Sequence, residues 1–208
     1  MSLNVWLTFI VAALLISLSP GPGAISCMAS GARYGYRRTL ANIVGMQLGI
    51  ALQLLVVGVG LGALLAASSL AFELAKGFGV AYLCYLGWQQ FRSEALPVEI
   101  GNRNHAPRTL RALVTQGFLI NASNPKATVF LLAVLPQFID PRAPALPQYL
   151  VCMATLTVVD LVIMSGYALF AARVLRLLRE PHHLRWMNRA FGSMFMLAAG
   201  LLALFRRA

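Results

Sequence analysis

Two charged side chains lie inside long apolar stretches of this 208-residue sequence, where they could carry chemistry. Asp160 is the sharper of the two, because residues 151–169 contain no other charge. Counting about 1.5 Å per residue from Gln148 places it roughly 18 Å along a helix, near the middle of a bilayer. A carboxylate at that depth should face the protein interior and have a partner. We predict that Asp160 binds and releases protons; the alternative is an acid that only locks helices together.

Lys126 is the second charged candidate and the natural partner of Asp160. Three alternatives stay open for its ammonium group. It can pair with Asp160, it can receive a substrate carboxylate, or it can reach the outer membrane surface along its own aliphatic stem.

Two proline motifs interrupt apolar runs, one in each half of the chain. Ser19-Pro20-Gly21-Pro22-Gly23 interrupts the first run, and Asn124-Pro125-Lys126 interrupts the fourth. Proline removes a backbone donor and collides with the preceding turn, so each motif should open a helix. Opened backbone at membrane depth survives only where protein or a wet cavity satisfies its polar groups. Paired interruptions are typical of the binding site of a secondary transporter, so we predict a substrate path lined by Pro20, Gly21, Pro22, Gly23, Asn124, Pro125 and Lys126.

The composition indicates an all-α integral membrane protein made of one domain, residues 1–208. Apolar residues make up 59% of the chain and charged residues 11%, and the mean hydropathy is +0.74. Glu73 and Lys76 are three residues apart near the start of the third apolar segment and are expected to pair. The first segment is expected to be a retained span, since no Lys or Arg precedes it. Six segments approach the ~20 residues that a crossing needs, at 3–28, 40–67, 69–91, 111–135, 147–172 and 189–205.

The positive charge lies between the apolar segments. The net charge is +11, and 15 of the 17 basic residues are Arg. Because these arginines occupy loops that would touch anionic headgroups, we expect membrane lipid as a partner and no nucleic acid. The loops after the first, third and fifth segments carry twelve basic residues, and the other side carries four. The positive-inside rule therefore places both termini outside the cytoplasm.

The two halves, approximately 1–100 and 108–208, resemble each other. Gly77–Tyr82 matches Ala190–Phe195 at an offset of 113 residues. A repeat of three spans must place its second copy upside down, so we predict a 3+3 inverted-topology repeat with broken helices 1 and 4. The same offset makes Gln47 the counterpart of Asp160, whereas an offset of 107 would choose Gln53; the sequence does not decide. Two pairs of glycines in the second segment, each pair four residues apart, predict close helix packing, namely Gly45, Gly49, Gly58 and Gly62.

Several other chemistries have no support in the sequence. It contains no H-E-x-x-H, C-x-x-C, G-x-S-x-G or Walker motif, so we expect no enzyme, no metal and no cofactor. The single cysteines Cys27, Cys84 and Cys152 argue against a membrane-embedded thiol-transfer protein. A non-transporting membrane subunit and a transporter of another small polar solute or ion stay as alternatives. Whether the chain forms a homo-oligomer is not decided by the sequence.

Taken together in order, four motifs resemble those of the LysE/RhtB family of bacterial amino-acid exporters. They are S-P-G-P-G at 19–23, N-P-K-A at 124–127, P-Q-F at 136–138 and D-x-x-x-x-x-G-Y at 160–167. The stretches at 71–82 and 191–197 look most like the homoserine and homoserine lactone exporters within that family. The resemblance implies a multi-pass protein of the bacterial inner membrane, and the loop charge then predicts that both termini are periplasmic. It implies export of small neutral amino acids or derivatives, such as homoserine, homoserine lactone and threonine, driven by protons.

Overall fold

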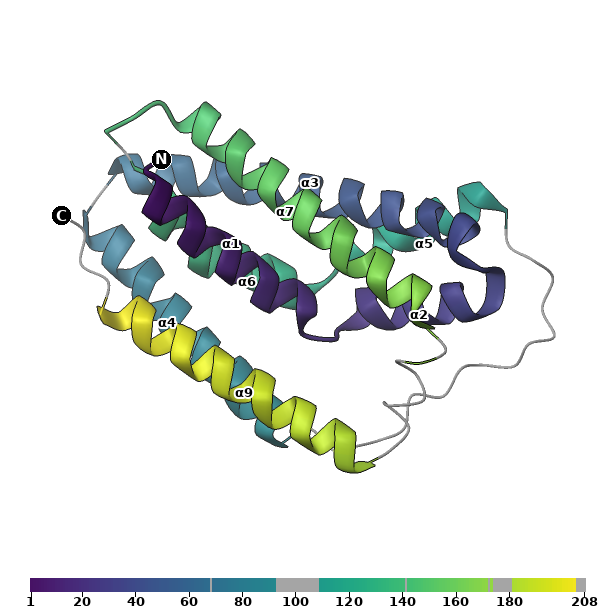
Figure 1. Ribbon diagram of the computed structural model, residues 1–208. Coiled ribbons are helices and arrows are strands. Elements are labelled where there is room, and N and C mark those ends of the chain that lie inside the picture. The colour runs from purple at the N-terminus through teal and green to yellow at the C-terminus, as the bar shows by residue number, and fades with distance from the viewer. Residues whose placement is uncertain (68, 93–108, 141, 172, 174–180, 205–208) are drawn as a thin grey trace.

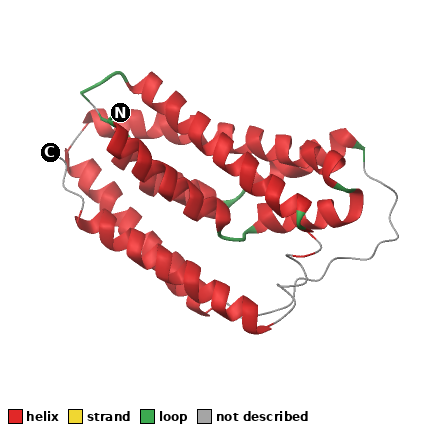
Figure 2. Cartoon of the chain, viewed as in Figure 1, coloured by secondary structure: helices red, strands yellow, loops and turns green. Residues whose placement is uncertain are grey.

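The protein is a bundle of helices that lie side by side along one long direction (Figure 1). The computed structural model describes residues 1–67, 69–92, 109–140, 142–171, 173 and 181–204, and these contain no strand (Figure 2). The start of the first helix and the end of the last lie at the same end of the bundle (Figure 1). The elements are α1 (Leu3–Leu18), α2 (Pro22–Tyr34), α3 (Tyr36–Ala67), α4 (Ser69–Arg92), α5 (Leu110–Ala122), α6 (Pro125–Val134), the 3-10 helix η1 (Leu135–Phe138), α7 (Ala145–Leu169) and α9 (Pro181–Leu204).

Both predicted interruptions are confirmed. The axes of α1 and α2 differ by 58°, and those of α5 and the α6–η1 segment differ by 50°. Pro22 and Pro125 each occupy the first turn of the second helix, where the missing backbone donor has no partner to lose. The Asn124 side chain caps α6 by accepting a hydrogen bond from the Lys126 backbone nitrogen at 3.1 Å. Each interruption is therefore a helix end followed directly by a new helix start.

Not every predicted membrane crossing is a helix that is long and apolar enough to span a membrane. Within the described residues, Tyr36–Gly60 and Ala145–Leu169 are each long and apolar enough to cross a membrane. Each bent pair also meets the criterion as one unit, which gives up to four crossings. Helices α4 and α9 do not meet it over their described residues, so the six crossings stay a prediction. Helix α9 begins at Pro181, well before the predicted 189, and the expected Glu73–Lys76 pair lies outside the described side chains.

Helices α3 and α5 touch backbone to backbone. A Cβ atom added to Gly45 would overlap the carbonyl oxygen of Val114, and one added to Gly117 would overlap the carbonyl oxygen of Asn42. At Gly49 the same atom would lie 2.8 Å from the Ala122 nitrogen. Only glycine permits this approach, which confirms the packing role predicted for Gly45 and Gly49.

Helices α4 and α9 form a second closely packed pair along one side of the bundle (Figure 1). A Cβ atom on Gly87 would lie 3.0 Å from the Gly192 carbonyl oxygen, and a Cβ atom on Gly192 would lie equally close to the Gly87 carbonyl oxygen. The crossing is thus nearly symmetric between the two helices. The pair contacts the rest of the bundle through α6, α3, η1 and α1.

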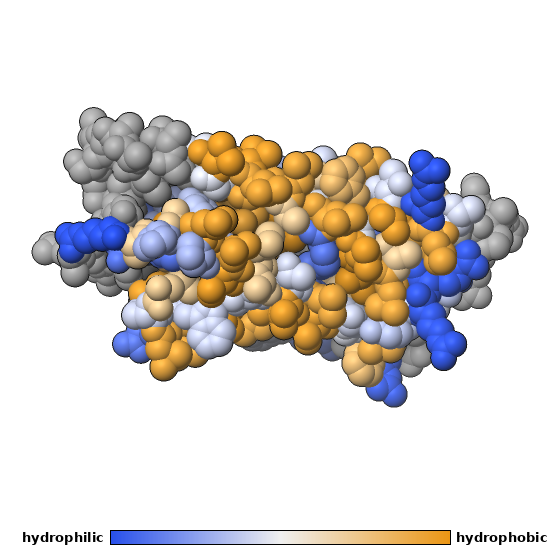
Figure 3. Space-filling model, turned by 90° about the horizontal axis from the view of Figure 1, so that it is seen from above, coloured by the Kyte–Doolittle hydropathy of each residue, from blue (hydrophilic) through white to orange (hydrophobic). Residues whose placement is uncertain are grey.

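The buried apolar residues form two clusters with polar groups between them. The larger contains Phe9, Leu54 and Leu156, and the smaller contains Met28 and Met164. On the outside, apolar side chains occupy the middle of the face seen in Figure 3, while strongly hydrophilic residues gather mainly toward its two ends. This surface pattern is typical of a protein surrounded by lipid.

Replacing Gly45 with Ala should destabilise the protein, because the α3 and α5 backbones must then move apart. Overpacking of this kind costs about 1–3 kcal/mol. Gly60 is a matched control, because a Cβ atom there would have no neighbour within 4 Å. We expect Gly45→Ala to lower the melting temperature of the detergent-solubilised protein and Gly60→Ala to leave it unchanged or slightly raised. Equal melting temperatures for the two variants would contradict the backbone contact.

Candidate functional site

The first break leaves carbonyl groups that side chains from distant elements satisfy. The Tyr167 hydroxyl of α7 donates to the Leu18 carbonyl oxygen at 2.6 Å. The Lys126 ammonium donates to the Ser19 carbonyl oxygen at 2.8 Å. Because both carbonyls have lost their helical donors to the Pro20–Pro22 interruption, each would otherwise lie unpaired in an apolar environment.

The second break is satisfied by one side chain of α3. The Gln53 amide nitrogen donates to the Thr128 hydroxyl at 2.7 Å, and it also lies 3.2 Å from the Asn124 carbonyl and 3.3 Å from the Ala122 carbonyl. Gln53 therefore joins the end of α5 to the start of α6. The opposite amide atom, Oε1, has no partner among the described residues.

Asp160 lies in the middle of α7 and is only 7% exposed. The Gln47 amide nitrogen donates to its Oδ2 atom at 2.7 Å, and the Ser17 side chain is a second hydrogen-bond partner. The expectation that Asp160 faces the interior with a partner is confirmed, and that partner is the residue at the 113-residue offset. Two neutral donors hold the carboxyl group in place, so its charge is not cancelled by a neighbouring cation.

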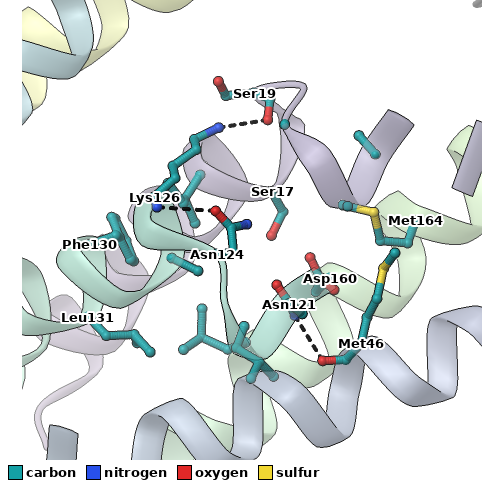
Figure 4. A pocket seen from close by; sticks show the side chains of 17 residues that line it. Ser17, Ser19, Met46, Asn121, Asn124, Lys126, Phe130, Leu131, Asp160 and Met164 are labelled. Atoms are coloured by element: carbon teal, nitrogen blue, oxygen red, sulfur yellow. Dashed lines mark hydrogen bonds between the residues drawn. The ribbon is translucent and has the colours of Figure 1, made fainter. Parts of the chain in front are cut away.

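Lys126 turns away from Asp160 toward the first break (Figure 4). Besides its bond to Ser19, its ammonium lies over the Phe195 ring, 5.7 Å from the centroid. No ion pair joins the lysine to Asp160 among the described residues, and the side chain does not reach outward to the membrane surface. Its one hydrogen-bond partner is a neutral carbonyl, so its charge stays uncompensated inside the protein.

One small cavity brings these groups together. Its volume is about 50 Å³, and Asp160 and Lys126 both line it. Since a buried water needs about 10–15 Å³ of such space, the cavity has room for a few waters and for no larger molecule in this conformation. Five of the predicted site residues line the cavity, namely Gly21, Gly23, Asn124, Lys126 and Asp160. The other four do not line it, namely Pro20, Pro22, Pro125 and Gln47. The prolines interrupt the helices around the cavity, and Gln47 donates a hydrogen bond to Asp160.

Sequence reasoning missed two polar residues of the cavity wall, Ser17 and Asn121. The Asn121 amide nitrogen donates to the Met46 carbonyl oxygen at 2.8 Å, which ties α5 to α3 beside Asp160 (Figure 4). Each lies three residues before the proline or the cap of its break, at Pro20 or Asn124. This common position was a signal available in the sequence.

The glycines of the first break are not forced by the backbone. Gly21 adopts an extended conformation, with φ −138° and ψ −170°, that any residue can adopt. A Cβ atom there would lie 3.8 Å from the Lys126 Cδ atom, and one on Gly23 would lie 3.6 Å from the Met46 sulfur. Both are ordinary contacts, so these glycines keep space open in the cavity and relieve no strain.

Comparison with known proteins relates the whole chain to one family. A family model described as LysE type translocator matches residues 14–205. An uncharacterized membrane protein of Vibrio cholerae is 43% identical over 98% of both chains. A homoserine/homoserine lactone efflux protein of Salmonella typhimurium is 42% identical over 100% of both chains. A leucine efflux protein of an Enterobacter species is 26% identical over 97% of this chain and 95% of its own. No solved structure matches.

The family resemblance carried by the four motifs is confirmed by these matches, and the apolar helices agree with the membrane location that the relatives' names state. Family relatives are efflux transporters and not enzymes. The chain belongs to the LysE type translocators.

Proposed function

We propose that this protein is an inner-membrane secondary transporter that exports small neutral amino acids or their derivatives in exchange for protons. Homoserine, homoserine lactone and threonine are the candidate cargoes. One observation carries the proposal: a single cavity at the two helix breaks is lined by an acid and a base that do not neutralise each other. The names of the relatives, which include homoserine/homoserine lactone efflux and leucine efflux, support the same class of cargo.

The cavity has a fitting group for each end of a zwitterion. Lys126 and the N-terminal end of α6 offer positive charge and dipole to a carboxylate. Asp160 offers its carboxyl group to a substrate ammonium. The Lys126–Ser19 bond, at 2.8 Å, can be exchanged for a bond to substrate, because its acceptor is a neutral carbonyl. The cavity must then expand, since about 50 Å³ does not accommodate an amino acid.

Asp160 also provides a physical reason for exchange. A substrate ammonium and a proton compete for the same buried carboxyl group, and an empty negative charge inside the membrane is costly. The protein therefore changes between its inward-open and outward-open conformations with either the substrate ammonium or a proton bound to Asp160. Gln47 and Ser17 hold the group in position in either state. Export of a cation-bearing substrate is thereby linked to uptake of a proton.

The proposed architecture is six crossings in two inverted halves, with α4 and α9 as the third and sixth. Two contacts support it. Gln47 and Asp160 meet although they are 113 residues apart, as expected of counterparts beside a two-fold axis. Gly87 of α4 and Gly192 of α9 approach each other symmetrically. In such a repeat, alternating access arises when one part of the bundle rocks against the other around the site.

Proteoliposomes loaded with homoserine test the proposed function directly. We expect efflux to rise when a pH gradient drives protons inward, and to exceed that of vesicles without the protein. Export of none of the candidate cargoes would favour the alternatives, which are a non-transporting subunit and a transporter of another small polar solute or ion.

Replacing Asp160 with Asn should abolish gradient-driven export, because the amide keeps the size and the hydrogen bonding of the acid but cannot carry a proton. Exchange at equal substrate concentrations without a pH gradient is expected to persist with a higher KM, because the amide oxygen can still accept a hydrogen bond from the substrate ammonium but carries no charge. The matched control is Asp140→Asn, since Asp140 is an exposed acid outside the helices. Uphill export by Asp160→Asn at the rate of the parent protein would show that the proton site lies elsewhere.

Replacing Pro20 or Pro125 with Ala should reduce transport while membrane abundance stays similar. A continuous helix would withdraw the carbonyl and amide groups that line the cavity. The control is Pro147→Ala, which alters an exposed proline in the first turn of α7, where proline breaks nothing. Transport would be measured as initial export rate per amount of protein in the membrane. If both variants transport at the rate of the parent protein, the two prolines only bend the helices and are not needed for transport.

The orientation is tested by labelling single cysteines at Ser2 and Ala208 in a chain that lacks Cys27, Cys84 and Cys152. The asymmetry of twelve against four basic residues predicts that both positions react with an impermeant reagent from the periplasmic side. Reaction of either position only after the membrane is breached would contradict this topology.

A further inference from the structure

A second cavity lies toward the end of the bundle where α1 begins. Its volume is about 280 Å³, and it is lined from α1, α4, α6, η1 and α9. Its walls are mostly apolar, with Leu83 from α4, Val134 from α6 and Phe195 from α9. Among the residues that the structure describes, no charged side chain lines it. This cavity is large enough for a small organic molecule, which the first cavity is not.

Gln137 is the unusual group in this second cavity. It is only 7% exposed, and neither the nitrogen nor the oxygen of its amide has a hydrogen-bond partner among the described residues. The Thr8 hydroxyl, which also lines the cavity, is already engaged by the Asn4 carbonyl oxygen at 2.8 Å. A buried amide with no partner is costly, and native proteins usually supply a ligand or an ordered water. Both amide atoms are covered in this conformation, so the Gln137 amide must turn toward the cavity to meet a polar group there.

Phe130 separates the two cavities. It lines both of them and is 4% exposed. Phe195 reinforces this boundary, because it lines the second cavity while its ring lies 5.7 Å from the Lys126 ammonium in the first. The two cavities thus share one aromatic wall.

A single face of the α6–η1 segment connects the two sites. Lys126, Phe130, Val134 and Gln137 are spaced by four, four and three residues, so they follow one side of the helix. Lys126 lines the first cavity, Phe130 lines both, and Val134 and Gln137 line the second. At about 1.5 Å per residue the face is roughly 16 Å long. It leads from the charged centre toward one end of the bundle.

We propose that the second cavity is an outer binding site on the export route, with Phe130 as the gate and Gln137 as the residue that binds a polar group of the departing molecule. This inference rests on the proposed export function. The absence of charge in the lining favours the uncharged part of the cargo, a lactone ring or an aliphatic side chain. The Gln137 amide offers one donor and one acceptor to an ester carbonyl or a hydroxyl group.

The first test uses Gln137→Leu, which keeps the volume of the side chain and removes its amide. In cells, exchange against external homoserine lactone reports the outer site, and export at varied internal concentration reports the inner one. We expect the external KM to rise by roughly fivefold or more, the usual effect of a lost neutral hydrogen bond. The internal KM should stay unchanged. A control variant, Phe78→Leu, alters an exposed aromatic residue of α4 that lines neither cavity.

The second test uses Phe130→Leu and Phe130→Ala, the former retaining enough apolar volume to preserve folding. A widened gate should let the internal substrate leak outward down its gradient without a pH gradient, more in Ala than in Leu. Unchanged leak rates in a folded Phe130→Leu protein would overturn the gate. An unchanged external KM in Gln137→Leu would overturn the outer site and leave the cavity to a lipid chain. If the parent protein transports nothing, the proposed function fails first, so the two failures are distinguishable.

Discussion

The structure depends on how two interrupted helices satisfy the backbone groups that they release. Away from water, each unpaired carbonyl costs free energy on the order of a lost hydrogen bond, about 1–3 kcal/mol. Here the partners come from elsewhere in the chain: Tyr167 and Lys126 serve the first break, and Gln53 serves the second. Through its hydrogen bond, each of these side chains holds the helix that carries it next to one of the breaks. The positions of α3, α6 and α7 around the centre therefore follow from the same few hydrogen bonds.

The same bonds explain why polar groups gather in the wall of the small central cavity. Residues of both apolar clusters line this cavity, and carbonyls, amides and charged groups gather between them. Lys126 serves as both a cap and a candidate ligand group. A molecule that takes the ammonium away from Ser19 must return something to that carbonyl, or the break must rearrange. Binding and helix geometry are coupled through this one bond.

The sequence predicted the breaks well because proline acts locally. Pro22 and Pro125 dictate a helix start whatever surrounds them. It also predicted that Asp160 would be buried with a partner, since an isolated carboxylate in an apolar run has few alternatives. It did not identify the partners of the released carbonyls. Tyr167 caps Leu18 from 149 residues away, and no local pattern encodes such a distance.

The fate of Lys126 shows the same limit. Two of its three alternatives are not seen, because among the described residues the ammonium neither pairs with Asp160 nor reaches the membrane surface but donates to the Ser19 carbonyl. The third, a substrate carboxylate, stays a prediction. Helices α4 and α9 show another limit of composition. Their segments are predicted to cross the membrane, and that stays a prediction, because over their described residues they are less apolar than α3 and α7. They pack against each other. Pairing between distant segments is tertiary information, which hydropathy along a single segment does not contain.

The backbone contact between α3 and α5 has a consequence for how the chain assembles. Gly45 and Gly49 precede their partners Val114 and Ala122 by about seventy residues, so α3 emerges from the ribosome long before α5 exists. Until then the glycine surface of α3 has no α5 backbone to cover it. The other tight pair, α4 with α9, likewise joins an early segment to a late one. The first half of the protein therefore lacks these two helix contacts when it is made, and the complete bundle forms only after α5 and α9 pack against α3 and α4.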